Sequence, residues 1–309
     1  MRGSLLLNGN IPQEADFVRT ARAHLVRSRH VDPQIQKSLK VLLVTAGWLD
    51  NEYKEAHVKK SLYDVGVPSK PRDGYDSNVQ NLSLYHLYQE FLEARPELAE
   101  SWRAREALIE SARTLYLEKN SFYTALLRKS LARLREHAPQ HNLARVWSEV
   151  QKVRSTLPTT FDGAGQVAQF IARDLQETLQ RLAENDDALV ALLHDLDEEF
   201  VTGTGLHYDE GWLRVRQELS SRILSSNSVF LFGGHLAVLH KCLSFFRLRE
   251  PLIEALRRGT SFYSVSAGSL VLCDRVIVYN DFESDFGPRR EFQLFDRGFG
   301  LIKHLQLFP

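Results

Sequence analysis

The chain has 309 residues, of which 43% are hydrophobic and 25% are charged, as expected for a globular protein with one large domain or two ordinary ones. Its 39 basic and 39 acidic side chains cancel, so composition gives no argument for a nucleic acid or an anionic membrane as a partner. No apolar run is long enough to span a bilayer, and the run Leu5–Leu7 is too short for a signal-peptide core.

The two cysteines, Cys242 and Cys273, lie in apolar helical contexts and neither has a C-x-x-C partner. We therefore expect buried, reduced thiols in a cytoplasmic protein.

The first third of the chain alternates between strand and helix signals. Strands are expected at 4–8, 39–45 and 79–85. A helix is expected over 14–28, and a second one runs from an N-cap at Asp50 to about residue 63. This alternation predicts a parallel α/β sheet.

Two long helical tracts follow. Residues 97–138 contain neither Gly nor Pro, and one helical face collects apolar side chains: Leu108, Ala112, Leu115, Phe122 and Leu126. A second tract covers 166–202, where Asn185 and Asp186 are a candidate break, and residues 156–165 between the tracts read as a loop. We predict a helical insertion over 87–224, which leaves 1–86 and 225–309 as a discontinuous α/β core.

The alternation then resumes. A strand is expected at 229–232, followed by a turn at 233–235 and a helix from Leu236. A second helix has Pro251 in its first turn and Gly259 as its C-terminal cap. Further strands are expected at 275–279, near 291–294 and near 301–307.

The stretch 261–274 has the pattern of a nucleophile elbow. A short buried strand at 261–265 leads into four small residues, Ser266 to Ser269, and then into a helical turn. Such a turn presents the Ser266 hydroxyl and points the following amides at a developing oxyanion. The G-x-S-x-G pattern is only partly met, because position 264 is Ser, and a plain tight turn between strand and helix is the alternative.

Other strand ends carry candidate site residues, because ligands of doubly wound sheets bind at the carboxyl ends of the strands. These candidates are Trp48, Gly233, His235 and Asn280, with Asp281 next to the last of them. Backbone amides of Gly234 and Ala267 would make a two-point oxyanion hole. No cofactor motif is present, and the pair His194 and Glu198 indicates a solvated helix face rather than a metal site.

The motifs FGGH before a helix, SVSAGS at the elbow, and a strand ending in ND together resemble the S51 serine peptidases. That group includes aspartyl dipeptidase (peptidase E) and cyanophycinase, within the class I glutamine amidotransferase-like fold. Asp281 follows Ser266 by 15 residues, and the Asn-Asp pair at 280–281 stands where peptidase E carries its own. The segments VTAGWLDNE and GFGLIKHLQLFP look similar to uncharacterised bacterial members with a long helical insertion.

The resemblance implies Ser266 as nucleophile, Asp281 as the acidic member, and Gly234 and Ala267 as oxyanion donors. It also implies a general-base histidine directly after a proline, downstream of a segment like GFGLIKHLQLFP. The given sequence stops at Pro309, so we expect either a chain cut just short of that histidine or a non-catalytic relative. His304 lies nearby and could substitute for it.

Two departures from the family pattern alter the pocket. His235 replaces a polar residue that is commonly Asn, and Val265 replaces an aromatic residue before the nucleophile. The acidic-peptide specificity of the characterised members is therefore not carried over.

The sequence thus predicts a three-layer α/β fold with a mostly parallel, doubly wound sheet of flavodoxin-like type and a large all-α insertion. The expected function is hydrolysis of a small peptide or amide substrate by Ser266, without a cofactor, and a homo-oligomer is left open. The alternative is an inactive α/β scaffold that binds a partner protein or a small ligand. A third hypothesis is a nucleotide or metabolite sensor at the Gly-Gly strand end.

Overall fold

The computed structural model describes residues 3–9, 14–25, 30–69, 77–137, 163–279, 292–303 and 305–307. The chain divides into two compact units, a sheet unit of residues 1–103 and 199–309, and a helical unit of residues 104–198. No helix in the described part of the chain is both long and apolar enough to cross a membrane.

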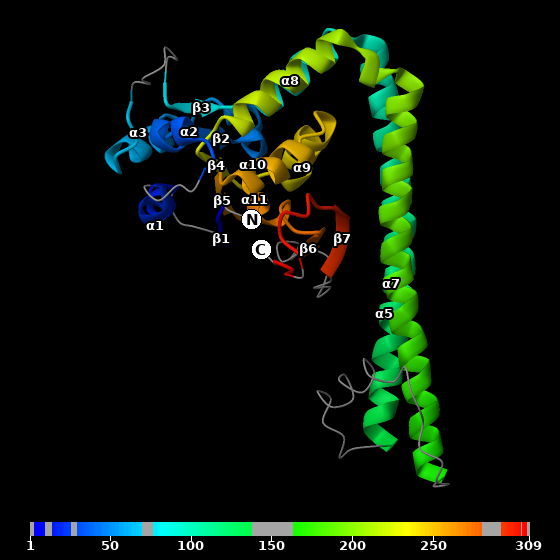
Figure 1. Cartoon of the computed structure of the whole chain (residues 1–309). Coiled ribbons are helices and arrows are strands. Elements are labelled where there is room, and N and C mark those ends of the chain that lie inside the picture. Colours follow the sequence, from blue (N-terminus) through cyan, green and yellow to red (C-terminus); the bar gives the residue numbers. More distant parts are fainter. Residues whose placement is uncertain are drawn as a thin grey trace. The chain divides into compact units, whose positions relative to one another are not determined.

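The centre of the sheet unit is a five-stranded, fully parallel sheet with the strand order β1-β5-β4-β2-β3 (Figure 1). Its strands are β1 (Leu5–Asn8), β2 (Val41–Val44), β3 (Val79–Asn81), β4 (Ser228–Leu231) and β5 (Ser261–Val265). All residues of β2, β4 and β5 are buried. Continuous burial of this kind is typical of parallel strands that are covered on both faces, and it explains why these strands are read from short apolar runs.

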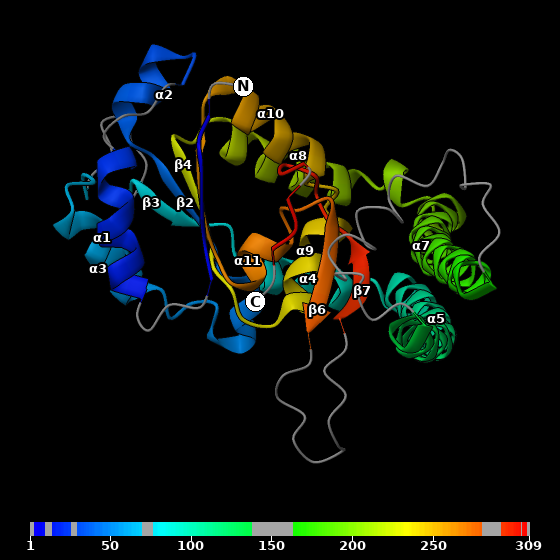
Figure 2. The ribbon, with the colours of Figure 1, turned by 90° about the horizontal axis from the view of Figure 1, so that it is seen from below.

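Helices cover both faces of the sheet, as Figure 2 shows. On one face lie α1 (Glu14–Leu25) and α3 (Ala56–Asp64), whose apolar side chains form a core with Phe230 and Tyr263 of the sheet. On the other face lie four more helices: α8 (Glu210–Leu224), α9 (Leu236–Phe245), α10 (Arg249–Arg258) and α11 (Ala267–Leu270). The three-layer α/β architecture predicted from the sequence is confirmed at this level.

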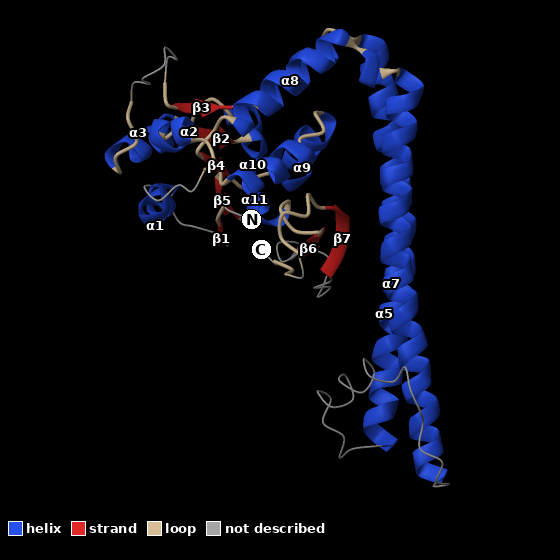
Figure 3. Ribbon diagram, in the orientation of Figure 1, coloured by secondary structure: helices blue, strands red, loops and turns tan. Residues whose placement is uncertain are grey.

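The remaining elements of the sheet unit are short. They are α2 (Pro33–Ser38), α4 (Leu84–Glu93), the 3₁₀-helices η1 (Ala46–Asn51) and η2 (Leu206–Tyr208), and the strands β6 (Arg275–Tyr279) and β7 (Phe292–Arg297) (Figure 3). β6 and β7 pair antiparallel in a separate two-stranded sheet, so β6 is not a sixth strand of the parallel sheet.

Three predicted elements are wrong in detail. The strand expected at 79–85 ends at Asn81, because Ser83 takes a left-handed conformation with φ of 53° and α4 begins at Leu84. Asp50 does not cap a helix, because it lies inside η1 and α3 begins only after Glu55. In the described part of 301–307 there is no strand, only one isolated bridge between Cys273 and Ile302.

The helical unit consists of most of α5 (Pro96–His137) and α7 (Gly163–Thr204), which run antiparallel. Polar contacts join them along their length: Arg105 to Asp197 at 3.0 Å, Tyr116 to Asp186 at 2.8 Å, and Ser130 to Asp174 at 2.6 Å. The expected break at residues 185–186 is absent, and α7 runs through it. These two polar residues bind the facing helix instead: Asn185 donates to the carbonyl of Tyr116, and Asp186 accepts from its hydroxyl.

The predicted limits of the insertion, 87 and 224, differ from the limits of the helical unit. Residues 87–103 and 199–224 pack with the sheet unit, because Phe91, Trp102, Phe200 and Trp212 are part of its main apolar core. The ring centroids of Trp102 and Phe200 lie 4.9 Å apart. The two chain segments that connect to the helical unit therefore lie against each other inside the sheet unit.

Candidate active site

Ser266 lies at the junction between β5 and α11, as the sequence predicts. Its backbone has φ of 48° and ψ of −121°, a conformation that L-residues rarely adopt. The amide of Ser266 donates to the carbonyl of Asn8 at 3.0 Å, and its carbonyl accepts from the amides of Ser269 and Leu270 at 2.8 and 3.1 Å. The chain therefore passes from β5 to α11 through this one residue, which is the backbone geometry of a nucleophile elbow.

Small residues let two other strand ends approach this turn. A Cβ on Gly233 would lie 2.9 Å from the Cβ of Ser266 and 3.2 Å from the amide nitrogen of Ala267. A Cβ on Gly47 would lie 2.7 Å from the carbonyl oxygen of Gly233. The chain segments that follow β2, β4 and β5 thus meet at Gly47, Gly233 and Ser266. A side chain at Gly47 or at Gly233 would not fit there.

Gly234 completes this junction. Its φ of +113° is a glycine conformation, and the amide of the next residue, His235, donates to the carbonyl of Gly47 at 2.8 Å. A Cβ on Gly234 would lie 3.3 Å from Cδ1 of Trp48. The structure therefore brings together Ser266, Gly233, Gly234, Ala267 and Trp48, five of the residues singled out from the sequence.

A second layer of hydroxyl groups fixes the first turn of α11. The hydroxyls of Ser264 and Ser269 lie 2.9 Å apart, and Ser269 donates to the carbonyl of Asn8 at 3.0 Å. Gly268 packs on the backbone of Leu231 with no room for a Cβ. This explains why small residues at 267–269 accompany Ser266: the helix turn rests directly on β1 and β4.

The Ser266 hydroxyl itself is partly exposed. Among the described residues, no side chain makes a hydrogen bond with it.

His235 lies next to the glycine turn and is exposed. It is the N-cap of α9: its Nδ1 accepts from the amide of Val238 at 3.3 Å. A neutral imidazole that accepts at Nδ1 carries its proton on Nε2. In this arrangement the free ring position of His235, Nε2, is a hydrogen-bond donor and not an acceptor.

Trp48 forms one wall of the same region. Its ring stacks on that of His57, with 5.8 Å between the ring centroids and an interplanar angle of 17°. The centroid of the Phe232 ring lies 5.3 Å away. These contacts hold the indole in place beside Gly234.

A buried acidic residue, Glu52, follows η1 at the same edge of the sheet. Its side chain is fully buried and accepts from the amide of His86 at 3.1 Å and from His86 Nδ1 at 2.8 Å. It also accepts from the amide of Tyr85 at 3.3 Å. Glu52 is therefore the acceptor at the N-terminus of α4, where Ser83 makes no capping hydrogen bond.

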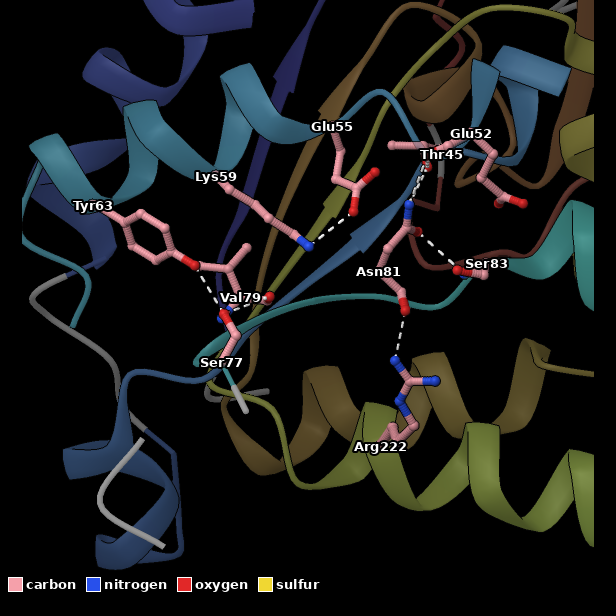
Figure 4. A network of polar contacts seen from close by, with 10 residues as sticks. All are labelled: Thr45, Glu52, Glu55, Lys59, Tyr63, Ser77, Val79, Asn81, Ser83 and Arg222. Atoms are coloured by element: carbon pink, nitrogen blue, oxygen red, sulfur yellow. Dashed lines mark hydrogen bonds and ion pairs between the residues drawn. The ribbon is translucent and has the colours of Figure 1, made fainter. Parts of the chain in front are cut away.

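The backbone of Glu52 is held by a polar network that Figure 4 shows. The side-chain amide of Asn81 donates to the hydroxyl of Thr45 at 2.7 Å and to the carbonyl of Glu52 at 3.0 Å. Arg222 donates to the carbonyl of Asn81 at 2.6 Å. One sequence signal could have found Glu52. It is an acidic residue shortly after a buried strand, and α4, further along the chain, has no capping side chain of its own.

Three of the predicted site residues lie outside the described residues: Asn280, Asp281 and His304. The strand that precedes the first two, β6, pairs with β7 and not with β5.

Neither cysteine is suited to nucleophilic chemistry. Both are buried free thiols. Burial raises the pKa of Cys242 far above that of an exposed thiol, with a further contribution from the charge of Glu52. Burial likewise raises the pKa of Cys273. Among the described residues no group of three His, Cys, Asp or Glu side chains could hold a metal ion.

Comparison with models of known protein families finds no match, and a search of curated proteins finds no relative of this chain.

Proposed function

We propose that the protein is a serine hydrolase that cleaves a peptide or amide bond, with Ser266 as its nucleophile. The observation that carries the proposal is the backbone of Ser266, at φ of 48° and ψ of −121°, between β5 and α11 and directly against Gly233. Strain of this kind costs about 1–3 kcal/mol and is concentrated at functional sites. The S51 resemblance of SVSAGS and FGGH supports the same assignment.

In this mechanism the Ser266 oxygen attacks the carbonyl carbon of the substrate while a base takes the hydroxyl proton. The carbonyl oxygen becomes an oxyanion, and the amides of Ala267 and Gly234 are proposed to stabilise it. The proton then passes to the leaving amine, and water hydrolyses the acyl-enzyme to release the acid and restore the hydroxyl. The resemblance assigns the acidic member to Asp281, and His304 is the nearby histidine proposed to substitute for the family's base.

A fluorophosphonate probe tests this proposal on the full chain, since it reacts with activated serines. The wild type is expected to be labelled, Ser266→Ala to lose the label, and Ser111→Ala, at an exposed serine of α5, to keep it. Gly233→Ala is expected to reduce labelling, because its Cβ would push against Ser266. Labelling that persists in Ser266→Ala would refute the assignment.

One observation favours a second candidate, an inactive α/β scaffold that binds a partner protein or a small ligand. His235, the histidine beside the glycine turn, is engaged at Nδ1 as a helix cap and is poorly placed to act as a base. A folded wild-type chain that resists the probe would support the scaffold over the hydrolase.

A further inference from the structure

Ser264 stands where the G-x-S-x-G pattern of a nucleophile elbow has its first glycine. The structure shows what accommodates the additional hydroxyl. Ser264 of β5 and Ser269 of α11 are both buried, at 0% and 3% exposure, and their hydroxyl oxygens lie 2.9 Å apart. A buried hydroxyl without a partner costs free energy, so the serine at 264 is accommodated by the serine at 269.

The hydrogen bonds of these two hydroxyls run in one direction. A backbone carbonyl can only accept, so the hydroxyl of Ser269 donates its single proton to the carbonyl of Asn8, at 3.0 Å. Ser264 is therefore the donor in the pair, and Ser269 is its acceptor. The result is a chain of hydrogen bonds from β5, through the first turn of α11, to the last residue of β1.

Ser269 is connected to both backbone polar groups of Ser266. The carbonyl of Asn8 that accepts from the Ser269 hydroxyl also accepts from the amide of Ser266, at 3.0 Å. The amide of Ser269 donates to the carbonyl of Ser266, at 2.8 Å. One residue thus restrains Ser266 on both sides of its strained φ and ψ angles.

We propose that Ser269 is a positioning residue for Ser266, and that Ser264 is the donor that fixes the Ser269 hydroxyl in place. Ser269 keeps the amide of Ser266 bound to β1, and it thereby maintains the backbone conformation that presents the Ser266 hydroxyl. Because both hydroxyls are buried, neither touches a substrate. The role in catalysis rests on the proposed function, whereas the backbone restraint does not.

Labelling kinetics with a fluorophosphonate probe separate positioning from binding. The maximal rate (kinact) measures the reactivity of Ser266, and the half-saturating concentration (KI) measures binding of the probe. Ser269→Ala removes the bond to Asn8 and leaves the Ser264 hydroxyl without an acceptor. We expect kinact to fall about tenfold or more and KI to change by about twofold or less. The double variant Ser264→Ala/Ser269→Ala removes the orphaned hydroxyl, so it is expected to be more stable than Ser269→Ala without recovering kinact.

The matched control is Ser226→Ala. Ser226 is also buried and donates its hydroxyl proton to a backbone carbonyl, that of Ile223 at 2.7 Å, but it precedes β4 and so lies at the opposite edge of the sheet. This variant is expected to lose stability in urea unfolding and to keep the wild-type kinact. Equal kinact in the wild type and in Ser269→Ala, or an equal fall in Ser269→Ala and Ser226→Ala, would overturn the positioning role.

Hydrogen exchange at the amide of Ser266 tests the backbone restraint without any activity. Ser269→Ala is expected to speed this exchange by about two- to tenfold, the equivalent of one net hydrogen bond, and Ser226→Ala to change it by a smaller factor. A wild type that the probe does not label would refute the hydrolase alone, and the exchange rates would still test the restraint. The same exchange rate at Ser266 in the wild type and in Ser269→Ala would overturn the restraint itself.

Discussion

Ser266 is half-buried, and its backbone has a conformation that favours glycine. A side chain at φ of 48° and ψ of −121° is strained whatever its chemistry. Nearby packing leaves the turn little room to relax, because Gly233 lies against Ser266 and Gly268 of α11 lies against the backbone of Leu231. A serine at this position is therefore expected to lower the stability of the fold relative to glycine.

This strain predicts a difference between two substitutions. Ser266→Gly is expected to be more stable than Ser266→Ala by about 1 kcal/mol, because glycine adopts the conformation freely even after its larger unfolded-state entropy is counted. Urea unfolding of the two variants and the wild type measures this. Equal stability of the two variants would mean that the turn is not strained.

At this scale the sequence identifies the elbow and the Gly-Gly turn because both depend on local composition. It does not identify Glu52 as a buried acceptor, because its partners Tyr85 and His86 are more than thirty residues away and meet it only through the order of β2 and β3 in the sheet. The burial of Ile109 in place of Leu108 is also not predicted, since both fit a helical apolar period and only the position of α7 decides between them.

Among the elements, α4 depends on a cap supplied from elsewhere. Glu52→Ala is expected to destabilise the protein by about 2–4 kcal/mol, because it leaves two helix amides and the Nδ1 group of His86 without their acceptor in a buried site. Glu93→Ala, at an exposed position of the same helix, is the control and is expected to change stability by about 0.5 kcal/mol or less. Chemical unfolding measures both, and similar effects in the two variants would contradict the capping role.

The N-terminus of α8 is capped by Asp209, which is also paired with Arg95. Asp209 accepts from the amide of Trp212 at 2.7 Å and from Arg95 at 3.0 and 3.1 Å, and these bonds, with that to Arg95 the larger cause, lower its pKa below the ordinary 3.8. A carboxyl group whose pKa is lowered on folding stabilises the protein above its unfolded value and loses that contribution as pH falls through its folded value.

We therefore expect wild-type stability to exceed that of Asp209→Asn at neutral pH, and the difference to shrink as pH falls below about 4. Thermal unfolding of both proteins between neutral and acidic pH measures it. A difference that stays constant down to the lowest pH would show that the charge of Asp209 does not contribute.

Element prediction from the sequence succeeds where periodicity is long or burial is continuous, as for α5, α7, β2 and β4. It fails at short irregular stretches. The chain between β2 and α3 forms a 3₁₀-helix in which Leu49 has φ of 57°, and no local sequence pattern predicts this conformation. The strand β6 was predicted correctly. Its pairing with β7 outside the main sheet depends on tertiary contacts, which no local sequence pattern predicts.

At the scale of the whole molecule, the Ser266 junction lies entirely within the sheet unit. Gly47, Gly233 and Ser266 all lie in it, and so do Trp102 and Phe200, whose rings meet at 4.9 Å where the chain leaves and returns. Because these two ends are already adjacent, a turn of about six Gly and Ser residues can join them in place of residues 104–198.

We expect the chain shortened in this way to fold as the sheet unit alone, with a cooperative thermal transition and a circular dichroism spectrum that has lost helix. It is expected to keep probe labelling at Ser266 if the wild type is labelled, because Gly47, Gly233 and Ser266 all lie in the sheet unit. The matched control carries Trp102→Ala in the shortened chain and is expected to unfold at lower temperature, since it removes the contact that closes the junction. A shortened chain that lacks a cooperative transition would show that the sheet unit depends on the helical unit to fold.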